Sequence, residues 1–260
     1  LNTVTGSLRV GEGAVVKSYC NSFYPNLVLD GGSLVVDGAT LTDYGDDTVG
    51  GDTGDGDCSG WWEIRESTAG SQVTIANSTV RRAQIGLGSG DGSVAVIRDS
   101  MLEESSVTAY GSLTLMGSTL TGRAGGGDSV RVGPSSGPTG LGVIVGNTFD
   151  GVAVSGWSLV GASSIRSNTF RNQIEPLTLS GSPATIVDLS SGSERNRFVG
   201  DDRERSILLT SMTVPAGASA RPSASAVATC PRGSARSPGC RRCRRWMPIP
   251  RRASSCWSPN

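Results

Sequence analysis

The sequence contains no histidine among its 260 residues and only one lysine, Lys17. The missing histidine excludes Ser-His-Asp and Cys-His catalysis, zinc sites with histidine ligands and HExxH proteases. The single lysine does not complete a GxxxxGK motif, which excludes a P-loop nucleotide site. Any chemistry must therefore come from Asp, Glu, Arg, Tyr, Ser or Cys side chains.

Aromatic residues are also scarce, at 5%, so a core must be built mainly from Val, Ile, Leu and Ala. Glycine is abundant, with 37 residues, about twice the usual share. This abundance indicates many turns that need positive φ or a close backbone approach. No hydrophobic run approaches the roughly 18 residues of a membrane span. The chain opens at Leu1 without a signal-peptide pattern, so we interpret it as a mature segment or a fragment.

Charge is distributed unevenly along the chain. Before Ala216 there are 14 basic and 23 acidic residues, a net charge of −9, whereas 216–260 contains nine arginines and no acid, a net charge of +9. We interpret 216–260 as a disordered Arg/Pro/Ser-rich tail and favour an out-of-frame translation as its origin. A genuine tail that binds an anionic surface, or a zinc site at its four cysteines, remains the alternative. Without patterned aromatic residues, we do not expect nucleic acid as a partner.

Short alternating apolar runs recur through the first 215 residues. They are SLRV (7–10), SLVV (33–36), QVTI (72–75), SVAVI (93–97), SLTL (112–115), GVIV (142–145), ATIVDL (184–189) and SILL (206–209). Most starts lie 19 to 30 residues apart, and the two longer spacings, 39 and 42, are about twice the shorter spacing. A period near 20 residues with strand and turn content predicts a solenoid in which one strand register returns in each coil.

Two recurring turn patterns favour the same architecture. VVDGATL (35–41), TIANSTV (74–80), VIRDSML (96–102) and TLMGSTL (114–120) place Gly, Asn or Asp before a small residue, polar in three of the four. GNTF (146–149), SNTF (167–170) and RNRF (195–198) place Asn two residues before Phe. Asn and Gly tolerate left-handed backbone geometry, so these patterns indicate turns at fixed places in a coil. A β-sandwich is the alternative, but it does not account for turns that recur at coil spacing.

The chain resembles the pectate-lyase-like right-handed parallel β-helix proteins, in particular the large bacterial secreted or cell-surface repeat proteins. GSLRVGEGAVVK (6–17), the acidic stretch LVVDGATLTDYGDDTVGGDTGDGD (34–57) with its return GWWEI (60–64), and the NTF turns carry the resemblance, which covers about residues 1–215. The resemblance implies a right-handed single-stranded parallel β-helix of about nine to ten coils and an extracellular or cell-surface location. Many such proteins have no known activity, so it implies fold and location more than chemistry.

The glycine-rich excursion at 42–60 contains candidate metal ligands. Hard carboxylate oxygens suit Ca²⁺, which takes six to eight of them. Neither an EF-hand loop nor the GGxGxD pattern matches, so a Ca²⁺ site of another geometry and a solvated loop both remain open, and no cofactor is required. The candidate ligands are Asp46, Asp47, Asp52, Asp55 and Asp57.

The catalytic candidates are Asp46, Asp47, Arg81 and Arg82. Hydrolysis of a glycosidic bond typically needs two carboxyl groups, and the resemblance implies lyases that use Ca²⁺ with an arginine base. Acid and arginine pairs are also common at solvent-facing strand ends. An enzyme should gather acids and arginines from three successive coils into one groove, whereas a scaffold should leave them dispersed.

Alternation within WWEI directs Trp62 and Ile64 to the core and leaves Trp61 and Glu63 outside. Trp61 is therefore the candidate for stacking on a sugar ring.

Cys20 and Cys58 are the only cysteines before the tail. They could form a disulfide in an exported protein or remain as two buried thiols.

We therefore expect a secreted or surface-exposed β-helix scaffold that contacts polysaccharide or other cell-surface material without catalytic activity. The alternative is a polysaccharide lyase or glycoside hydrolase acting on an acidic polysaccharide in the side groove of the helix. The sequence does not indicate an oligomeric state.

Overall fold

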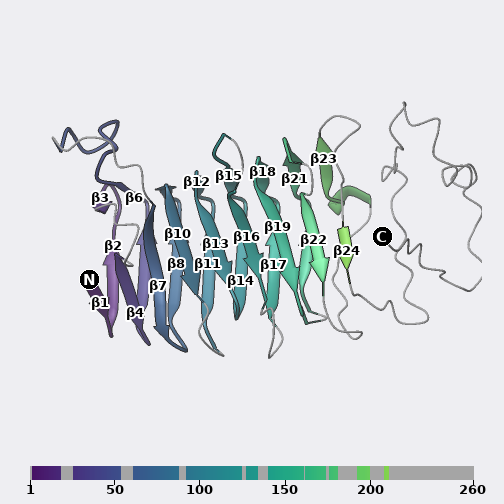
Figure 1. Ribbon diagram of the computed structural model, residues 1–260, viewed down its shortest axis with the longest axis horizontal. Coiled ribbons are helices and arrows are strands. Elements are labelled where there is room, and N and C mark those ends of the chain that lie inside the picture. Colours follow the sequence, from purple (N-terminus) through teal and green to yellow (C-terminus); the bar gives the residue numbers. More distant parts are fainter. Residues whose placement is uncertain are drawn as a thin grey trace, which may run out of the picture. The chain divides into compact units, whose positions relative to one another are not determined.

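The computed structural model describes residues 2–18, 26–53, 61–87, 92–124, 127–133, 140–160, 162–173, 176–180, 192–199 and 208–210. Nearly all of the regular structure in these residues is β-strand, arranged in three parallel sheets that run side by side (Figure 1). The predictions for Cys20, Cys58, Asp55, Asp57, ATIVDL (184–189) and the tail 216–260 concern residues outside the described ranges.

The strands of the three sheets have the following bounds. Sheet A contains β1 (Asn2–Val4), β4 (Leu27–Asp30), β7 (Trp62–Thr68), β10 (Ala83–Leu87), β13 (Ser106–Ala109), β16 (Ser129–Val132), β19 (Ala153–Trp157), β22 (Leu177–Ser180) and β24 (Leu208–Thr210). Sheet B contains β2 (Ser7–Val10), β5 (Ser33–Asp37), β8 (Gln72–Ala76), β11 (Val94–Arg98), β14 (Ser112–Met116), β17 (Leu141–Val145) and β20 (Ser164–Arg166). Sheet C contains β3 (Val15–Ser18), β6 (Thr40–Asp43), β9 (Thr79–Arg81), β12 (Met101–Glu103), β15 (Thr119–Thr121), β18 (Thr148–Asp150), β21 (Thr169–Arg171) and β23 (Arg197–Val199). A 3₁₀ turn, η1 (Gly192–Glu194), precedes β23.

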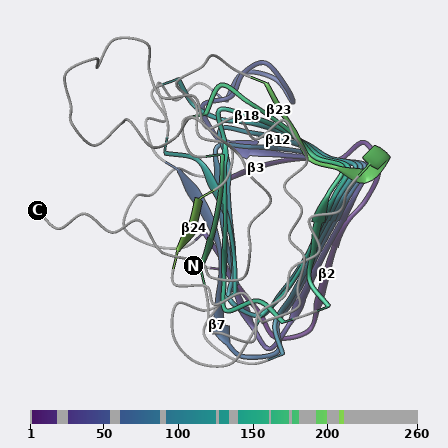
Figure 2. The same ribbon diagram turned by 90° about the vertical axis from the view of Figure 1, so that its right-hand side faces the viewer.

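Each coil places one strand in sheet A, then one in sheet B, then one in sheet C. Coil 1 is β1 to β3, coil 2 is β4 to β6, and the numbering continues to coil 7, which is β19 to β21. Every strand pairs in parallel with the equivalent strands of neighbouring coils. Seen along the stack, the sheets form three sides around one interior (Figure 2). The chain is therefore a right-handed single-stranded parallel β-helix, which confirms the predicted fold class.

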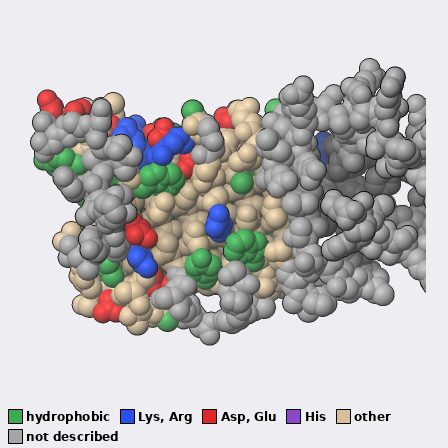
Figure 3. Space-filling view, viewed as in Figure 1, with side chains coloured by type: hydrophobic (Ala, Val, Ile, Leu, Met, Phe, Trp, Pro, Cys, Tyr) green, Lys and Arg blue, Asp and Glu red, His purple; other side chains and the backbone are tan. Residues whose placement is uncertain are grey.

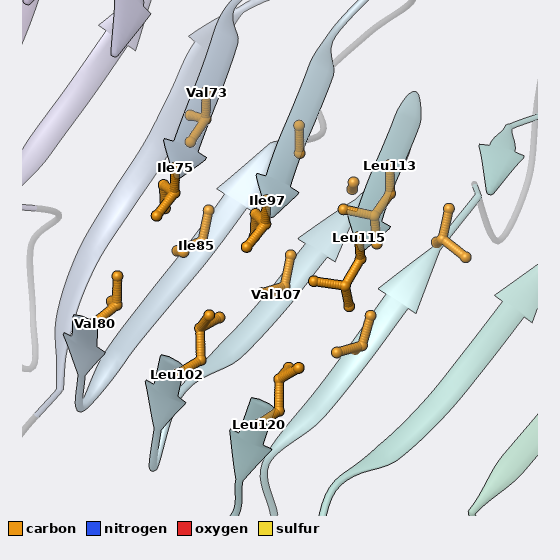
Figure 4. Packing of buried hydrophobic residues seen from close by; sticks show 14 of the residues in the cluster. Val73, Ile75, Val80, Ile85, Ile97, Leu102, Val107, Leu113, Leu115 and Leu120 are labelled. Carbon is orange, nitrogen blue, oxygen red and sulfur yellow. The ribbon is translucent and has the colours of Figure 1, made fainter. Parts of the chain in front are cut away.

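The interior is built from small and medium apolar side chains stacked coil on coil, as predicted. In sheet B, Val73, Ala95 and Leu113 are register partners on consecutive strands, and all three are fully buried. Figure 4 shows the same arrangement around Ile85 and Val107 of sheet A and Leu102 of sheet C. Because each inward side chain contacts its equivalents above and below, the low aromatic content still gives a continuous core.

The turn between sheets B and C has the same geometry in six successive coils. Its first residue always has a left-handed φ of 50° to 71°, and its second residue is largely buried. The first residues are Gly38, Asn77, Asp99, Gly117, Gly146 and Ser167. The two turn patterns recognised in the sequence are therefore one structural turn, occupied by Ser in the middle coils and by Asn in the later ones.

The second residues of the last five turns, together with Asn196 before β23 in coil 8, form a ladder of hydrogen bonds, which we call the polar ladder. Each side-chain oxygen accepts a hydrogen bond from the backbone N–H of the equivalent residue one coil earlier. The acceptors are Ser78 (3.2 Å), Ser100 (3.2 Å), Ser118 (3.2 Å), Asn147 (2.9 Å), Asn168 (2.9 Å) and Asn196 (3.1 Å). Buried backbone groups at this corner are thereby satisfied.

A stack of phenylalanines follows the asparagines of the polar ladder. The rings of Phe149 and Phe170 lie 4.9 Å apart at 13°, and those of Phe170 and Phe198 lie 5.0 Å apart at 9°. The NTF spacing in the sequence therefore brings both the amide and the ring of each coil over those of the next.

Two details of the predicted repeat are wrong. The repeat predicts that SILL (206–209) shares the strand register of the runs that form sheet B, but β24 pairs with β22 of sheet A. The 39-residue spacing from SLVV to QVTI is not two coils, because β5 and β8 are direct neighbours. The extra length lies in the excursion that leaves sheet C after Asp43 and rejoins sheet A at Trp62.

Helices long and apolar enough to cross a membrane are absent from the described residues.

Candidate functional site

Charged side chains of coils 2 to 5 gather where the strands of sheet C end and the chain turns toward sheet A. We call this group the charged corner, and Figure 3 shows acidic and basic side chains along that edge. The parallel register explains the grouping, because Arg81 and Glu103 are partners on neighbouring strands. The charged corner consists of Asp43, Asp46, Arg81, Arg82, Glu103, Glu104 and Arg123.

Asp46 and Arg81 form the most enclosed pair of the charged corner. Asp46 Oδ2 lies 2.9 Å from Arg81 Nη1 and accepts a hydrogen bond of 2.7 Å from the Thr42 hydroxyl. Its Oδ1 accepts hydrogen bonds from the backbone and side chain of Thr48. Burial alone would raise the pKa of Asp46, but the hydrogen bonds from Thr48, Thr42 and Arg81 lower the pKa well below its usual value. Asp46 is therefore ionised and fully engaged.

Arg81 also forms an ion pair with the following coil, on the side away from Asp46. Its Nε lies 2.6 Å from Glu103 Oε2, so one guanidinium joins the carboxylates of coils 2 and 4. The hydrogen bond to Asp46, together with the charges of Glu103 and Asp46, raises the pKa of Arg81, although burial opposes the rise. A guanidinium held in this way stays protonated and does not serve as a base.

Arg82 is the turn residue of coil 3, with a left-handed φ of 52°. Its Nη1 lies 2.9 Å from Oδ2 of the fully buried Asp43, and its Nε lies 3.9 Å from Glu104. Glu104 in turn lies 3.7 Å from Arg123 Nε. The structure thus pairs Arg81 with Asp46 and Arg82 with Asp43, and it adds Asp43, Glu103 and Glu104, which the sequence analysis did not name.

The remaining metal candidates lie in or beyond the described part of the excursion. Asp47 is 53% exposed and lies 3.7 Å from Lys17 Nζ, while Asp52 is exposed. Lys17 also donates a hydrogen bond of 2.5 Å to the carbonyl of Gly51. Within the described residues, no three His, Cys, Asp or Glu side chains gather as metal ligands. A Ca²⁺ site that includes Asp55 or Asp57 stays a prediction.

The two tryptophans have different environments. Trp62 is 4% exposed and Ile64 is fully buried, which confirms the alternation predicted for WWEI. The Trp62 indole N–H donates a hydrogen bond of 2.8 Å to the carbonyl of Arg81. Trp61 is half-buried, and the guanidinium of Arg123 lies 4.8 Å from its ring centroid. One face of Trp61 is thus covered by a cation–π contact, which leaves less of the ring for a sugar.

A second candidate region lies on the outer face of sheet A and was not predicted from the sequence. It is a hollow of about 580 Å³ over β7, β10, β13 and β16, on the face that Figure 3 shows. Its lining includes Glu63, Arg65, Gly86, Thr108, Tyr110 and Arg131. None of Asp46, Asp47, Arg81 and Arg82 lines it.

The floor of the hollow follows from the strand register. Arg65, Gly86, Thr108 and Arg131 are successive partners on four neighbouring strands, so two long side chains flank two short ones. A Cβ added to Gly86 would meet nothing closer than 3.8 Å, which shows that the space above it is open. The alternation along β7 that places Glu63 on the outer face also places Arg65 there. The exposure of Arg65 could therefore have been predicted from the sequence. The placement of Arg65 and Arg131 in one row depends on three successive strand alignments, of β7 with β10, β10 with β13 and β13 with β16.

Asp128, in the loop that follows β15, is a buried carboxyl beside the charged corner. It is 2% exposed, its Oδ2 accepts a hydrogen bond from the backbone N–H of Arg123, and its Oδ1 lacks a hydrogen-bond partner in the described part of the chain. Burial raises the pKa of Asp128, and the charge of Glu104 adds to the rise, although the backbone N–H and the charge of Arg123 oppose it. The ionised form of Asp128 therefore makes the folded state less stable than the protonated form does.

We expect Asp128→Asn to stabilise the protein at neutral pH. A raised pKa in the folded state means that the carboxyl favours folding below its ordinary pKa of about 3.9 and loses that contribution as the pH rises through the folded value. The gain should therefore appear above the folded pKa and vanish toward pH 3, as measured by thermal unfolding across this range. Asp128→Ala, which removes the acceptor for Arg123, should destabilise instead. Equal curves for Asp128→Asn and the parent would contradict the assignment.

No protein-family model matches the sequence, and the comparisons with curated proteins and with solved structures likewise found no match.

Proposed function

We propose that this chain is an exported, surface-exposed β-helix scaffold that holds glycan or other cell-surface material without catalysing a reaction on it. The single observation that carries the proposal is the saturation of the charged corner. Asp46 is bonded by two threonines and Arg81, Arg81 also holds Glu103, and Arg82 holds the buried Asp43. Groups engaged in this way support the structure and have little freedom to bind or protonate a substrate.

The hollow on sheet A is the proposed contact surface. Its lining mixes hydroxyl, amide and guanidinium groups with the exposed ring of Tyr110, and Trp157 lies two coils further along the same edge. Hydrogen-bonding groups beside an aromatic ring suit sugars, which present hydroxyls at their rim and C–H groups on their faces. We also propose that the chain is related to the pectate-lyase-like β-helix proteins and shares the bacterial extracellular or cell-surface location that this relationship implies. The single-stranded parallel β-helix fold supports the proposed relationship.

The second candidate function is a polysaccharide lyase or glycoside hydrolase that acts on an acidic polysaccharide. The observation that favours it is the gathering of acids and arginines from coils 2 to 5 at one corner, as expected of an enzyme. Asp47 is the candidate that remains half exposed, beside Lys17. Any such reaction would have to proceed at the edge of the ion-pair network.

The two functions predict different results when the purified chain meets a panel of polyuronates and neutral glycans, with and without Ca²⁺. For a scaffold, we expect saturable binding by calorimetry, with neither unsaturated product by ultraviolet absorbance nor new reducing ends. Turnover that disappears in Asp47→Ala would establish the enzyme, because replacing this exposed side chain leaves the core intact. Turnover that persists in Asp47→Ala would also overturn the scaffold and would place the chemistry elsewhere.

A further inference from the structure

The outer face of sheet B has a central area in which the described strands place no charged side chain. In β5, β8, β11, β14 and β17, the first and third residues point outward, and each of them is Ser, Gln, Thr, Val or Leu. We call these first and third residues the uncharged face. The outer face of sheet A, by contrast, carries Glu63, Arg65 and Arg131.

Strands of this area are apolar on both sides. β11 reads VAVIR and β17 reads LGVIV, so that Val94 and Val96 point outward while Ala95 and Ile97 fill the core. Strands of parallel sheets have such continuous apolar runs when both faces of the sheet are covered, whereas a strand with one face in water alternates apolar and polar residues. The sequence of sheet B is therefore typical of a sheet whose outer face is also covered.

The middle row of the uncharged face follows from the strand register. It consists of Val35, Thr74, Val96, Thr114 and Val143, which are successive partners on five neighbouring strands, and each is partly exposed. All five side chains are β-branched and similar in size, so the row is even, with about 4.8 Å between strands. The order Val-Thr-Val-Thr-Val is the same in both directions.

These properties suit a second copy of the same sheet. The uncharged face offers neither an aromatic ring to stack on a sugar nor a cation to bind an anion. A two-fold contact uses the same surface of both copies. Because the middle row reads the same in both directions, two facing copies bring Val onto Val and Thr onto Thr whether their coils run in the same or in opposite directions. Sheets with apolar side chains between them stack face to face at about 10 Å.

The area of sheet B fits a small protein interface. Its seven strands at about 4.8 Å each, and five residues at about 3.3 Å each, give a face of about 34 by 16 Å. Two such faces bury about 1,000 Å² in total, at the lower end of specific interfaces. Charged residues lie at the edges, with Arg9 in coil 1 and Asp37, Arg98 and Arg166 at strand ends. An uncharged centre with a polar rim is typical of a protein–protein contact.

From these observations we propose that the uncharged face is a dimer interface, in which sheet B of one copy packs against sheet B of a second copy and Val96 lies opposite Val96. The dimer is independent of glycan binding. Because sheets A and B form different sides of the helix (Figure 2), the dimer leaves the hollow of each copy open. Given the small area, we expect association in the micromolar range.

Sedimentation equilibrium of the full chain at increasing concentration tests the proposal. The parent should pass from monomer to dimer without forming larger species, and the dimer should persist in high salt because the contact is apolar. Val96→Lys and Val96→Glu should each weaken association at least about tenfold, since each places like charges opposite one another. An equimolar mixture of these two variants should form the dimer again, because opposite charges then face each other.

A matched pair of threonines separates the interface from a general effect of added charge. Thr114 lies in the middle row, whereas Thr119 is exposed on the outer face of sheet C. Thr114→Glu should weaken the dimer, and Thr119→Glu should leave it unchanged. Both variants should unfold near the temperature of the parent, because neither side chain points into the core.

Each of the other outcomes overturns the proposal. A parent that stays monomeric up to its highest soluble concentration has no such interface. A dimer that survives Val96→Lys, or a mixture that fails to recover the dimer, places the contact elsewhere. Oligomers that grow beyond the dimer would assign the contact to the ends of the helix. Binding of uncharged phosphatidylcholine vesicles by the parent, lost in Val96→Lys, would assign the uncharged face to a lipid surface.

Discussion

Phe170→Ala is expected to lower the free energy of unfolding by about 3–5 kcal/mol, the range for removing a fully buried phenylalanine. Phe170 is 1% exposed and is the middle ring of three, with neighbours at 4.9 and 5.0 Å, so its loss removes both ring contacts and leaves a cavity that neighbouring coils cannot fill. Chemical denaturation followed by circular dichroism measures the change.

The matched control for Phe170 is the last described ring of the same stack. Phe198 is only partly buried and has one described ring neighbour, so Phe198→Ala should cost clearly less. Equal losses at the two positions would show that the stack is not a cooperative part of the core. Phe170→Leu, which retains most of the volume, should recover much of the stability.

Asn168→Ala is expected to destabilise the protein by about 2–6 kcal/mol, because it strands two buried backbone groups at about 1–3 kcal/mol each. The Asn168 carboxamide oxygen accepts a hydrogen bond of 2.9 Å from the backbone N–H of Asn147, and its Nδ2 donates one of 2.8 Å to the carbonyl of Ile144. Removing the side chain interrupts the polar ladder between coils 6 and 8. Thermal and chemical unfolding should both report the loss.

Serine provides the control at this position, because the chain itself uses serine in the same place in earlier coils. Ser118 accepts from the N–H of Ser100 and donates to the carbonyl of Met116. Asn168→Ser should therefore keep the acceptor for Asn147, lose the bond to Ile144, and fall between the parent and Asn168→Ala. A serine variant as unstable as the alanine variant would mean that packing, and not the ladder, accounts for the effect.

The sequence predicted the features that depend on local alternation and on repetition. The inward direction of Trp62 and Ile64, and the recurring left-handed turn at Asn77 and Gly117, follow from strand parity and from the backbone preferences of Asn and Gly. These properties are set within a few residues, so they can be read without knowledge of neighbouring coils.

Features that depend on register between coils were harder to predict. Arg81 was expected near Asp46, but its second partner, Glu103, requires the alignment of β9 with β12. The hollow between Arg65 and Arg131 requires three such alignments across turns of different length. Assigning SILL to the wrong sheet shows the same limit, since an apolar alternating run does not identify which of three equivalent sides it occupies.

The lengths of the connections give the polar ladder a further consequence. In coils 2 to 7, two residues always separate the sheet B strand from the sheet C strand, as at 99–100 and 117–118. From sheet C to sheet A the connection ranges from the single residue Arg82 to the long excursion after Asp43. One edge of the helix thus keeps a fixed chain length, while the opposite corner accommodates inserted segments. New loops can therefore accumulate beside the hollow and reshape its rim without disturbing the alignment of the coils.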